Sequence, residues 1–103
     1  MASGILGQSN PTANTNTTVY TVPSSVTASA TISVTNLSGA IAVVSFAVAA
    51  SGTPGNSEWI FYSYPLPGYG TIERSGIIAQ TGKNFVVVST TANVAVSVYG
   101  YEN

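Results

Sequence analysis

The chain has 103 residues, a formal net charge of −1 and only 5% charged residues, where an average soluble domain has about 25%. It contains no Cys, His or Asp, so disulfides, metal sites built from thiolates or imidazoles, and histidine general bases are excluded. With two basic residues, it is not expected to bind the phosphates of a nucleic acid. The longest apolar run, residues 40–50, is too short to span a bilayer.

Residues 1–18 are predicted to be an extended polar arm outside the folded domain, because Asn, Thr, Ser and Gln dominate this segment. Its only large apolar residues after the first position are Ile5 and Leu6, and Pro11 restrains the backbone near its middle. A segment that buries so little apolar surface does not order by itself. We therefore expect a partner to bind Ile5, Leu6 and Pro11, and we expect a chain without residues 2–16 to fold.

Residues 19–103 are predicted to form one β domain. Its clearest strand is residues 26–36, where apolar residues alternate with Thr and Ser at the period of two that strands have. One face of this strand should be buried, and the hydroxyl face is either solvated or packed against another subunit. Residues 36–39 are predicted to be a hairpin turn leading into the apolar run 40–50, which should be covered on both faces.

Short strands are predicted along the rest of the domain, separated by segments rich in Gly, Pro, Asn and Ser. They are residues 19–22, 59–64, 71–74, 77–79, 85–89 and 94–101. About eight short strands at regular spacing, with no segment of helical period, predict an all-β fold. The expected architecture is an antiparallel β-sandwich, jelly-roll-like, with the extended N-terminal arm attached.

An aromatic group lies in and after residues 59–64. Strand alternation would place Trp59 and Phe61 on one face and Tyr62 and Tyr64 on the other. Such aromatic residues can fill the core, anchor a subunit interface, or form a flat platform for a neutral sugar. Two further tyrosines lie in the last strand, opposite its valines. The candidates for an interface or a glycan site are Trp59, Tyr62, Tyr64, Tyr69, Tyr99 and Tyr101.

No catalytic, cofactor-binding or metal-binding residue is predicted. The single lysine, Lys83, lies in a turn, where lysines are usually solvated. The three glutamates, Glu58, Glu73 and Glu102, show no spacing that would pair them for acid–base work or gather them around a cation. We therefore expect a protein that is not an enzyme and needs no cofactor.

Several short motifs occur in a recognisable order. They are Tyr-x-Val-Pro at 20–23, Val-Thr-Asn at 34–36, Trp-Ile-Phe-Tyr at 59–62, Pro-Leu at 65–66, Ile-Ile-x-x-x-Gly at 77–82 and Val-Tyr-Gly-Tyr-Glu at 98–102. This order resembles the small β-sandwich structural proteins of tailed bacteriophages, which include capsid decoration (cement) proteins and domains of tail proteins. The resemblance covers about residues 19–102 and rests on core and turn positions, which carry fold more than function.

The resemblance implies a non-enzymatic virion structural protein. The leading expectation is a capsid decoration protein that binds and stabilises the shell as an oligomer, commonly a trimer, with the major capsid protein or another virion protein as its partner. The alternative is a tail or tail-fibre module, structural or receptor-binding, that contacts host glycans. A decoration protein should bury its aromatic residues between subunits, whereas a glycan-binding protein should expose them in a groove among amide and hydroxyl groups. Neither a nucleic acid nor a membrane is an expected partner.

Overall fold

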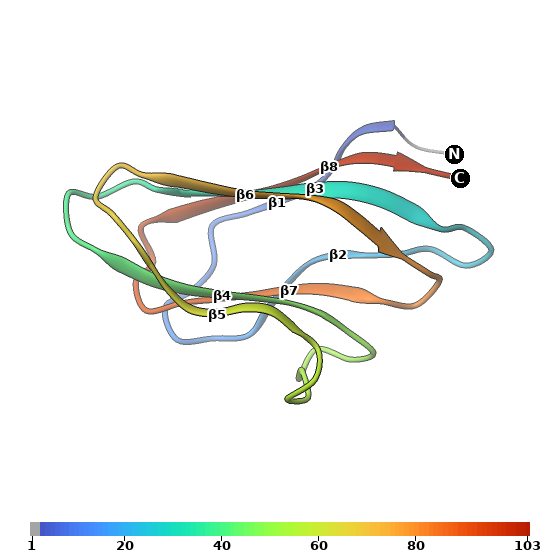
Figure 1. The fold of residues 1–103 in the computed structure, drawn as a ribbon, viewed down its shortest axis with the longest axis horizontal. Helices are drawn as coiled ribbons and strands as arrows, with labels where there is room; N and C mark the ends of the chain where they lie inside the picture. Colours follow the sequence, from blue (N-terminus) through green and yellow to red (C-terminus); the bar gives the residue numbers. More distant parts are fainter. Residues whose placement is uncertain (1–2) are drawn as a thin grey trace.

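The structure is a computed structural model that describes residues 3–103. These residues form two antiparallel four-stranded sheets that face each other, and they contain no helix (Figure 1). The strands are β1 (Ser3–Ser9), β2 (Thr17–Thr21), β3 (Ala28–Asn36), β4 (Ala42–Ala49), β5 (Trp59–Leu66), β6 (Thr71–Ala79), β7 (Asn84–Ser89) and β8 (Val94–Glu102). The predicted all-β antiparallel sandwich is thus confirmed. Within the described range, no helix is long and apolar enough to cross a membrane.

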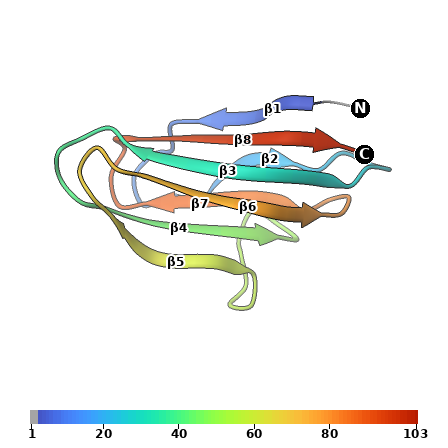
Figure 2. The same cartoon turned by 45° about the horizontal axis from the view of Figure 1, so that its top comes forward.

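The order of strands differs from the order of the chain in both sheets. Sheet A has the order β1-β8-β3-β6, and sheet B has the order β2-β7-β4-β5 (Figure 2). Loops from both sheets meet at each end of the sandwich. The chain termini lie at one end, and the β3–β4 and β5–β6 connections lie at the other (Figure 1).

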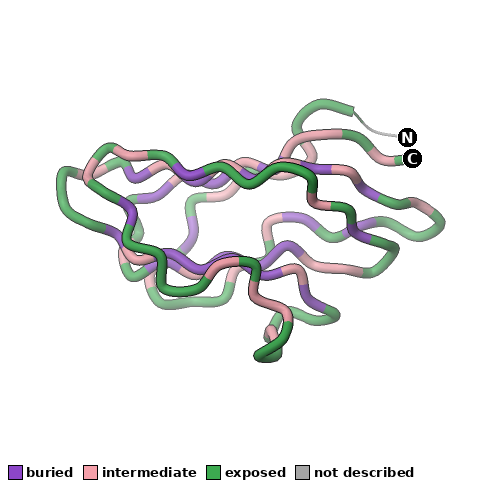
Figure 3. The backbone as a smooth tube through the Cα atoms, in the orientation of Figure 1, coloured by how far each residue is buried: buried purple, intermediate pink, exposed green. Residues whose placement is uncertain are grey.

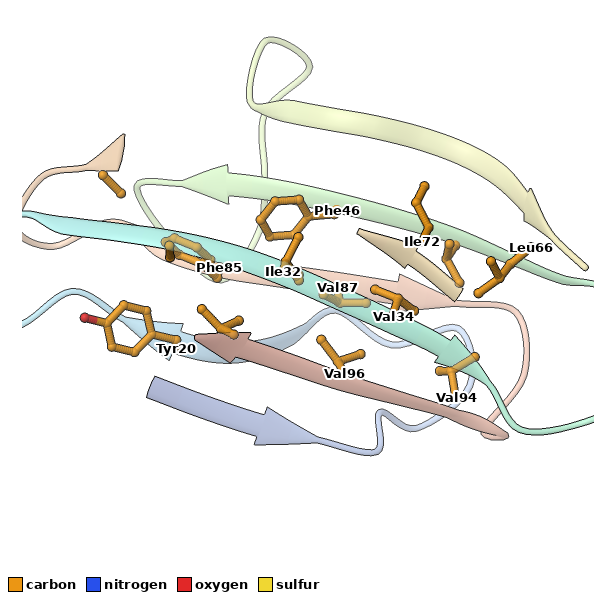
Figure 4. Packing of buried hydrophobic residues seen from close by; sticks show 14 of the residues in the cluster. Tyr20, Ile32, Val34, Phe46, Leu66, Ile72, Phe85, Val87, Val94 and Val96 are labelled. Carbon is orange, nitrogen blue, oxygen red and sulfur yellow. The ribbon is translucent and has the colours of Figure 1, made fainter. Parts of the chain in front are cut away.

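The core fills the space between the two sheets. Ile32 and Val34 of β3 point toward Phe46 of β4 and Phe85 of β7, and all four side chains are fully buried (Figure 4). The rings of Phe46 and Phe85 lie 5.7 Å apart. In β3 buried residues alternate with half-buried Ser and Thr, as the period of two predicted. Most of β4 is buried on both faces, which was also predicted.

The segment predicted to be an arm is largely part of the sandwich, which corrects the expected boundary at residue 18. Residues 3–9 are β1, an edge strand that pairs with β8 from Ser3↔Tyr101 to Ser9↔Val96. Residues 17–18 begin β2 in the other sheet. Backbone hydrogen bonds to β8 hold β1 in place. Such bonds cannot be recognised from a polar side-chain pattern, so the sequence did not predict this strand. Residues 1–2 of the predicted arm lie outside the described residues.

The predicted hairpin turn at residues 36–39 is wrong. The chain crosses there from sheet A to sheet B, because β3 pairs with β6 and β8 whereas β4 pairs with β5 and β7. The buried Asn36 side chain stabilises this crossover. Its Nδ2 donates to the carbonyl oxygens of Ala40 (2.7 Å), Leu66 (3.2 Å) and Pro67 (3.1 Å). Its Oδ1 accepts the backbone N–H of Ser38 (3.0 Å).

The strands predicted at residues 71–74 and 77–79 are one strand, β6. The pairing with β3 shifts between Ile77, which faces Ala30, and Arg74, which faces Ile32. Two residues of β6 therefore stand opposite one residue of β3, which is a β-bulge. Gly76 in this bulge has φ of 73°, a conformation that glycine adopts without strain. Residues 75–76, which separated the two predicted strands, are thus an irregularity inside one continuous strand.

Candidate functional site

Two bulges in β5 turn its aromatic side chains to both faces of sheet B. Trp59 pairs with Ala47, and Phe61 pairs with Phe46. Paired residues share a face and consecutive residues of β4 point in opposite directions, so Trp59 and Phe61 lie on opposite faces. The predicted sharing of one face by these two residues is therefore wrong. Phe61 packs against the core, while Trp59 points outward.

Trp59 and Tyr62 form an aromatic pair on the outer face of sheet B. Their ring centroids are 5.0 Å apart at an interplanar angle of 69°, an edge-to-face contact. Between them and Tyr64 lies Ser63, whose φ of 52° lies in the left-handed region that few non-glycine residues adopt. The Ser63 N–H donates to the buried Ser45 hydroxyl oxygen at 2.8 Å, which fixes this bend in β5. Tyr64 pairs with Val44, on the core side of the sheet.

The aromatic pair borders a groove across the outer face of sheet B. Its volume is about 220 Å³, and a second hollow of about 320 Å³ is lined by the same pair together with Asn56. No charged residue lines either hollow. The first is lined by Asn16, Val43, Ser45, Trp59, Tyr62, Ser63, Val88 and Thr90. We call the two hollows together the aromatic groove.

Glu58 braces the loop that carries Asn56. Its Oε1 accepts the N–H of Gly55 at 2.7 Å, and its Oε2 accepts the N–H of Ala50 at 3.0 Å. These two backbone hydrogen bonds, with the Gly55 bond contributing most, lower the pKa of the exposed Glu58 carboxyl. The ionised carboxylate is therefore the form that holds residues 50–58 beside the aromatic groove.

This brace should be lost in acid. Because the pKa of Glu58 is lower in the folded chain than in the unfolded one, its contribution is complete above the unfolded pKa and disappears as the pH falls through the folded pKa. In an NMR pH titration, the amide signals of Ala50 and Gly55 should move together with a midpoint below the ordinary Glu pKa. In Glu58→Gln neither signal should show that transition. A midpoint at the ordinary value would contradict the brace.

A second notable surface lies at the end of the sandwich opposite the chain termini. Leu37, Ile41 and Tyr69 gather there, with 54%, 64% and 75% of their surfaces exposed. The loops at this end are mostly exposed in Figure 3, and none of residues 10–16, 37–41, 67–70 and 90–93 is charged. We call these three side chains the end patch. The β6–β7 connection, which contains Lys83, and the end of β8, which contains Glu102, lie at the opposite end (Figure 1).

The end patch is rigidly held. Tyr69 has φ of 59°, a strained conformation for a bulky residue, yet its backbone N–H donates to the Ser38 carbonyl at 2.9 Å. Gly68 lies so close to the Gly39 backbone that a Cβ atom there would collide with it. The neighbouring crossover is fixed by Asn36. The fold therefore presents an exposed tyrosine ring at the expense of backbone strain, an arrangement often found at functional sites.

A third surface is the outer face of sheet A near the termini. Ile5 pairs with Tyr99, while Tyr101 and Ile78 lie on either side of Ser29 in the next row of residues. Ile5, Ile78 and Tyr101 are all more than half exposed. We call these three residues the sheet A patch.

Tyr99 lies beside the sheet A patch and makes a hydrogen bond across the sheet. Its hydroxyl donates to the Glu73 Oε2 at 2.6 Å, and this bond is the main cause of the raised pKa of Tyr99.

The three residues predicted to bind a partner through the arm have different environments. Leu6 packs against the core, and Pro11 is buried. Ile5 is exposed and belongs to the sheet A patch. Leu6 and Pro11 thus contribute to the fold of this chain, and Ile5 is the one member of the set whose side chain is available on the surface.

Sequence reasoning missed Asn16, Leu37, Ile41 and Ile78 as surface candidates. Asn16 was assigned to the arm, and Ile41 and Ile78 were counted as ordinary strand residues. A signal was present for Leu37, since a large apolar residue within a turn of Asn, Ser and Gly is unusual. For Asn16 and Ile78 only the three-dimensional pairing of the strands brings them to these surfaces.

Within residues 3–103, no three His, Cys, Asp or Glu side chains gather closely enough to hold a metal ion. The candidate surfaces are the aromatic groove, the end patch and the sheet A patch. No protein-family model, curated protein or solved structure matches this chain.

Proposed function

We propose that the chain is a non-enzymatic virion structural protein, a capsid decoration protein that attaches to the shell as an oligomer, most simply a trimer. The observation that carries the proposal is the surface. Among residues 3–103, nine large hydrophobic side chains are exposed, and the whole chain has only five charged residues. A solvated domain usually carries many surface charges and few exposed large apolar residues, because an apolar surface with few charges promotes association. This surface suits a protein that is permanently bound to neighbouring subunits.

The strand order supports the same proposal at the level of the fold. Each sheet combines strands from both halves of the chain, in the orders β1-β8-β3-β6 and β2-β7-β4-β5. We propose that this double-sheet arrangement is a jelly roll, the architecture of many viral capsid and lectin domains. Because a fold hosts many functions, this argument is secondary to the surface.

The two apolar patches suggest separate tasks. We propose that the sheet A patch joins copies of the chain, since it lies on a flat sheet face whose remaining side chains are largely Ser and Thr. The end patch would contact the shell, because it projects from one end, is rigid and is surrounded by uncharged loops. Attachment would then rest on apolar contacts and hydrogen bonds rather than on ion pairs.

The test is attachment to native particles that lack this protein. Wild-type protein should sediment as an oligomer on its own and should co-sediment with the particles. Ile41→Asp combined with Tyr69→Asp should remain folded and oligomeric, because aspartate tolerates the left-handed region better than tyrosine does. This variant should lose most of its attachment, since two charges would be buried against apolar surface.

A matched control places two aspartates at the opposite end. Ser24→Asp combined with Gln80→Asp adds the same charge at exposed positions, and it should attach as wild type does. Equal attachment of both variants would contradict the end patch as the contact surface. Failure of wild-type protein to attach at all would contradict the decoration function.

A further inference from the structure

The aromatic groove has the features of a ligand site. Its two rings are set edge to face, and β5 departs from regular strand geometry twice to bring both to the outer face. Bulges of this kind commonly re-aim side chains at functional sites. The bend at Ser63 is fixed by a hydrogen bond from its backbone N–H to the buried Ser45 hydroxyl oxygen, so the arrangement is already formed without a ligand.

The lining specifies the chemistry of the ligand. It contains aromatic rings, amides and hydroxyls but no charged side chain, which disfavours phosphates, nucleotides and acidic or basic peptides. A neutral pyranose has an apolar C–H face that stacks on an aromatic ring, and its hydroxyls both donate and accept hydrogen bonds. Rings and hydrogen-bonding groups of these kinds surround the groove.

Hydrogen-bonding capacity remains at the walls of the groove. The Ser45 and Thr90 hydroxyl oxygens each accept one backbone N–H, from Ser63 and Val43, so each hydroxyl still has a proton to donate. The side-chain amides of Asn16 and Asn56 make no hydrogen bond to any other described residue. Amides of this kind recognise neighbouring sugar hydroxyls through one donor and one acceptor group.

The geometry points to a binding site for a neutral oligosaccharide. Trp59 and Tyr62 line both hollows, which have volumes of about 220 Å³ and about 320 Å³, so one aromatic pair serves both. We therefore propose that the aromatic groove binds two adjacent rings of an uncharged glycan chain. This activity goes beyond shell attachment and uses a different face, so either proposal can fail without the other.

Fluorescence tests this proposal directly, because Trp59 is the only tryptophan of the chain. Maltohexaose, cellohexaose and chitohexaose, three neutral probes, would be titrated into the full chain to about 10 mM, a range that captures the millimolar affinities typical of weak binding. At least one should give a saturable change in emission. Oligogalacturonate, an acidic probe, should give none.

Two variants locate the site. Tyr62→Ala, which keeps the fluorescent Trp59, should weaken binding roughly tenfold, the effect of losing one aromatic stacking partner. Tyr69→Ala removes another exposed tyrosine, from the end patch, and should bind the glycan as wild type does. Circular dichroism would verify that both variants keep the β fold.

Three results would overturn the proposal. One is the absence of a saturable change with all three neutral probes. Another is unchanged affinity in Tyr62→Ala. The third is an emission shift produced by raising the concentration of the protein alone, because the groove would then be covered by a second copy of the chain.

Discussion

Removing residues 2–9 should destabilise the β domain severely. The deletion takes away β1, exposes the backbone N–H and C=O groups of β8 along a new sheet edge, and removes Leu6 from the margin of the core. Loss of several backbone hydrogen bonds and one half-buried leucine should cost about 3–5 kcal/mol of unfolding free energy. Small domains have about 5–15 kcal/mol in total. Urea unfolding followed by Trp59 emission measures the loss.

The control for this deletion is Ile5→Ser. It removes an exposed side chain from β1 but retains the backbone pairing with Tyr99, so the free energy of unfolding should change by less than about 1 kcal/mol. A truncated chain as stable as the full one would contradict the structural role of β1. It would restore the interpretation of this segment as an arm.

The substitution Asn36→Ala should have the second large effect. Asn36 is 1% exposed, and its amide nitrogen donates to three carbonyl oxygens, one in the β3–β4 connection and two at the end of β5 and the start of the β5–β6 connection. Alanine would leave these carbonyls without that donor, and burial denies them full access to water. We expect a loss of about 2–4 kcal/mol in the free energy of unfolding, measured by urea titration.

Asn56→Ala is the matched control, because the Asn56 side chain is exposed in a loop and makes no hydrogen bond to any other residue in 3–103. Its unfolding free energy should stay within about 0.5 kcal/mol of wild type. If Asn36→Ala were equally mild, the crossover would be held by backbone contacts alone. The end patch would then owe its rigidity to the Gly39–Gly68 contact.

Strong side-chain periodicity made much of the fold predictable. The alternation in residues 26–36 identified β3 and its buried face, and the valine-rich run identified β4. The strand β1 was missed because Ser3–Ser9 contains two glycines and little apolar surface. This strand forms by pairing with β8, which lies at the other end of the sequence. The prediction of about eight strands matches the structure only because two errors cancel: β1 was missed, and β6 was counted as two strands.

The binding surfaces were less predictable than the fold. The aromatic residues of 59–64 were identified, but strict alternation assigned Trp59 to the wrong face. Bulges depend on pairing with β4, and Ser63 at positive φ carries no sequence signature. The end patch joins Leu37 and Ile41 to Tyr69 through the crossover between sheets. No local pattern can foresee that contact.

The salt dependence of shell attachment tests the central claim most directly. That claim is that uncharged, apolar surfaces hold this chain in its assembly. Co-sedimentation with native particles would be measured from about 0.1 M to about 1 M NaCl, a range over which the screening length falls from about 10 Å to about 3 Å. We predict that occupancy stays constant or rises with salt. Release of the protein at high salt would show that ion pairs carry the attachment, and it would contradict the claim.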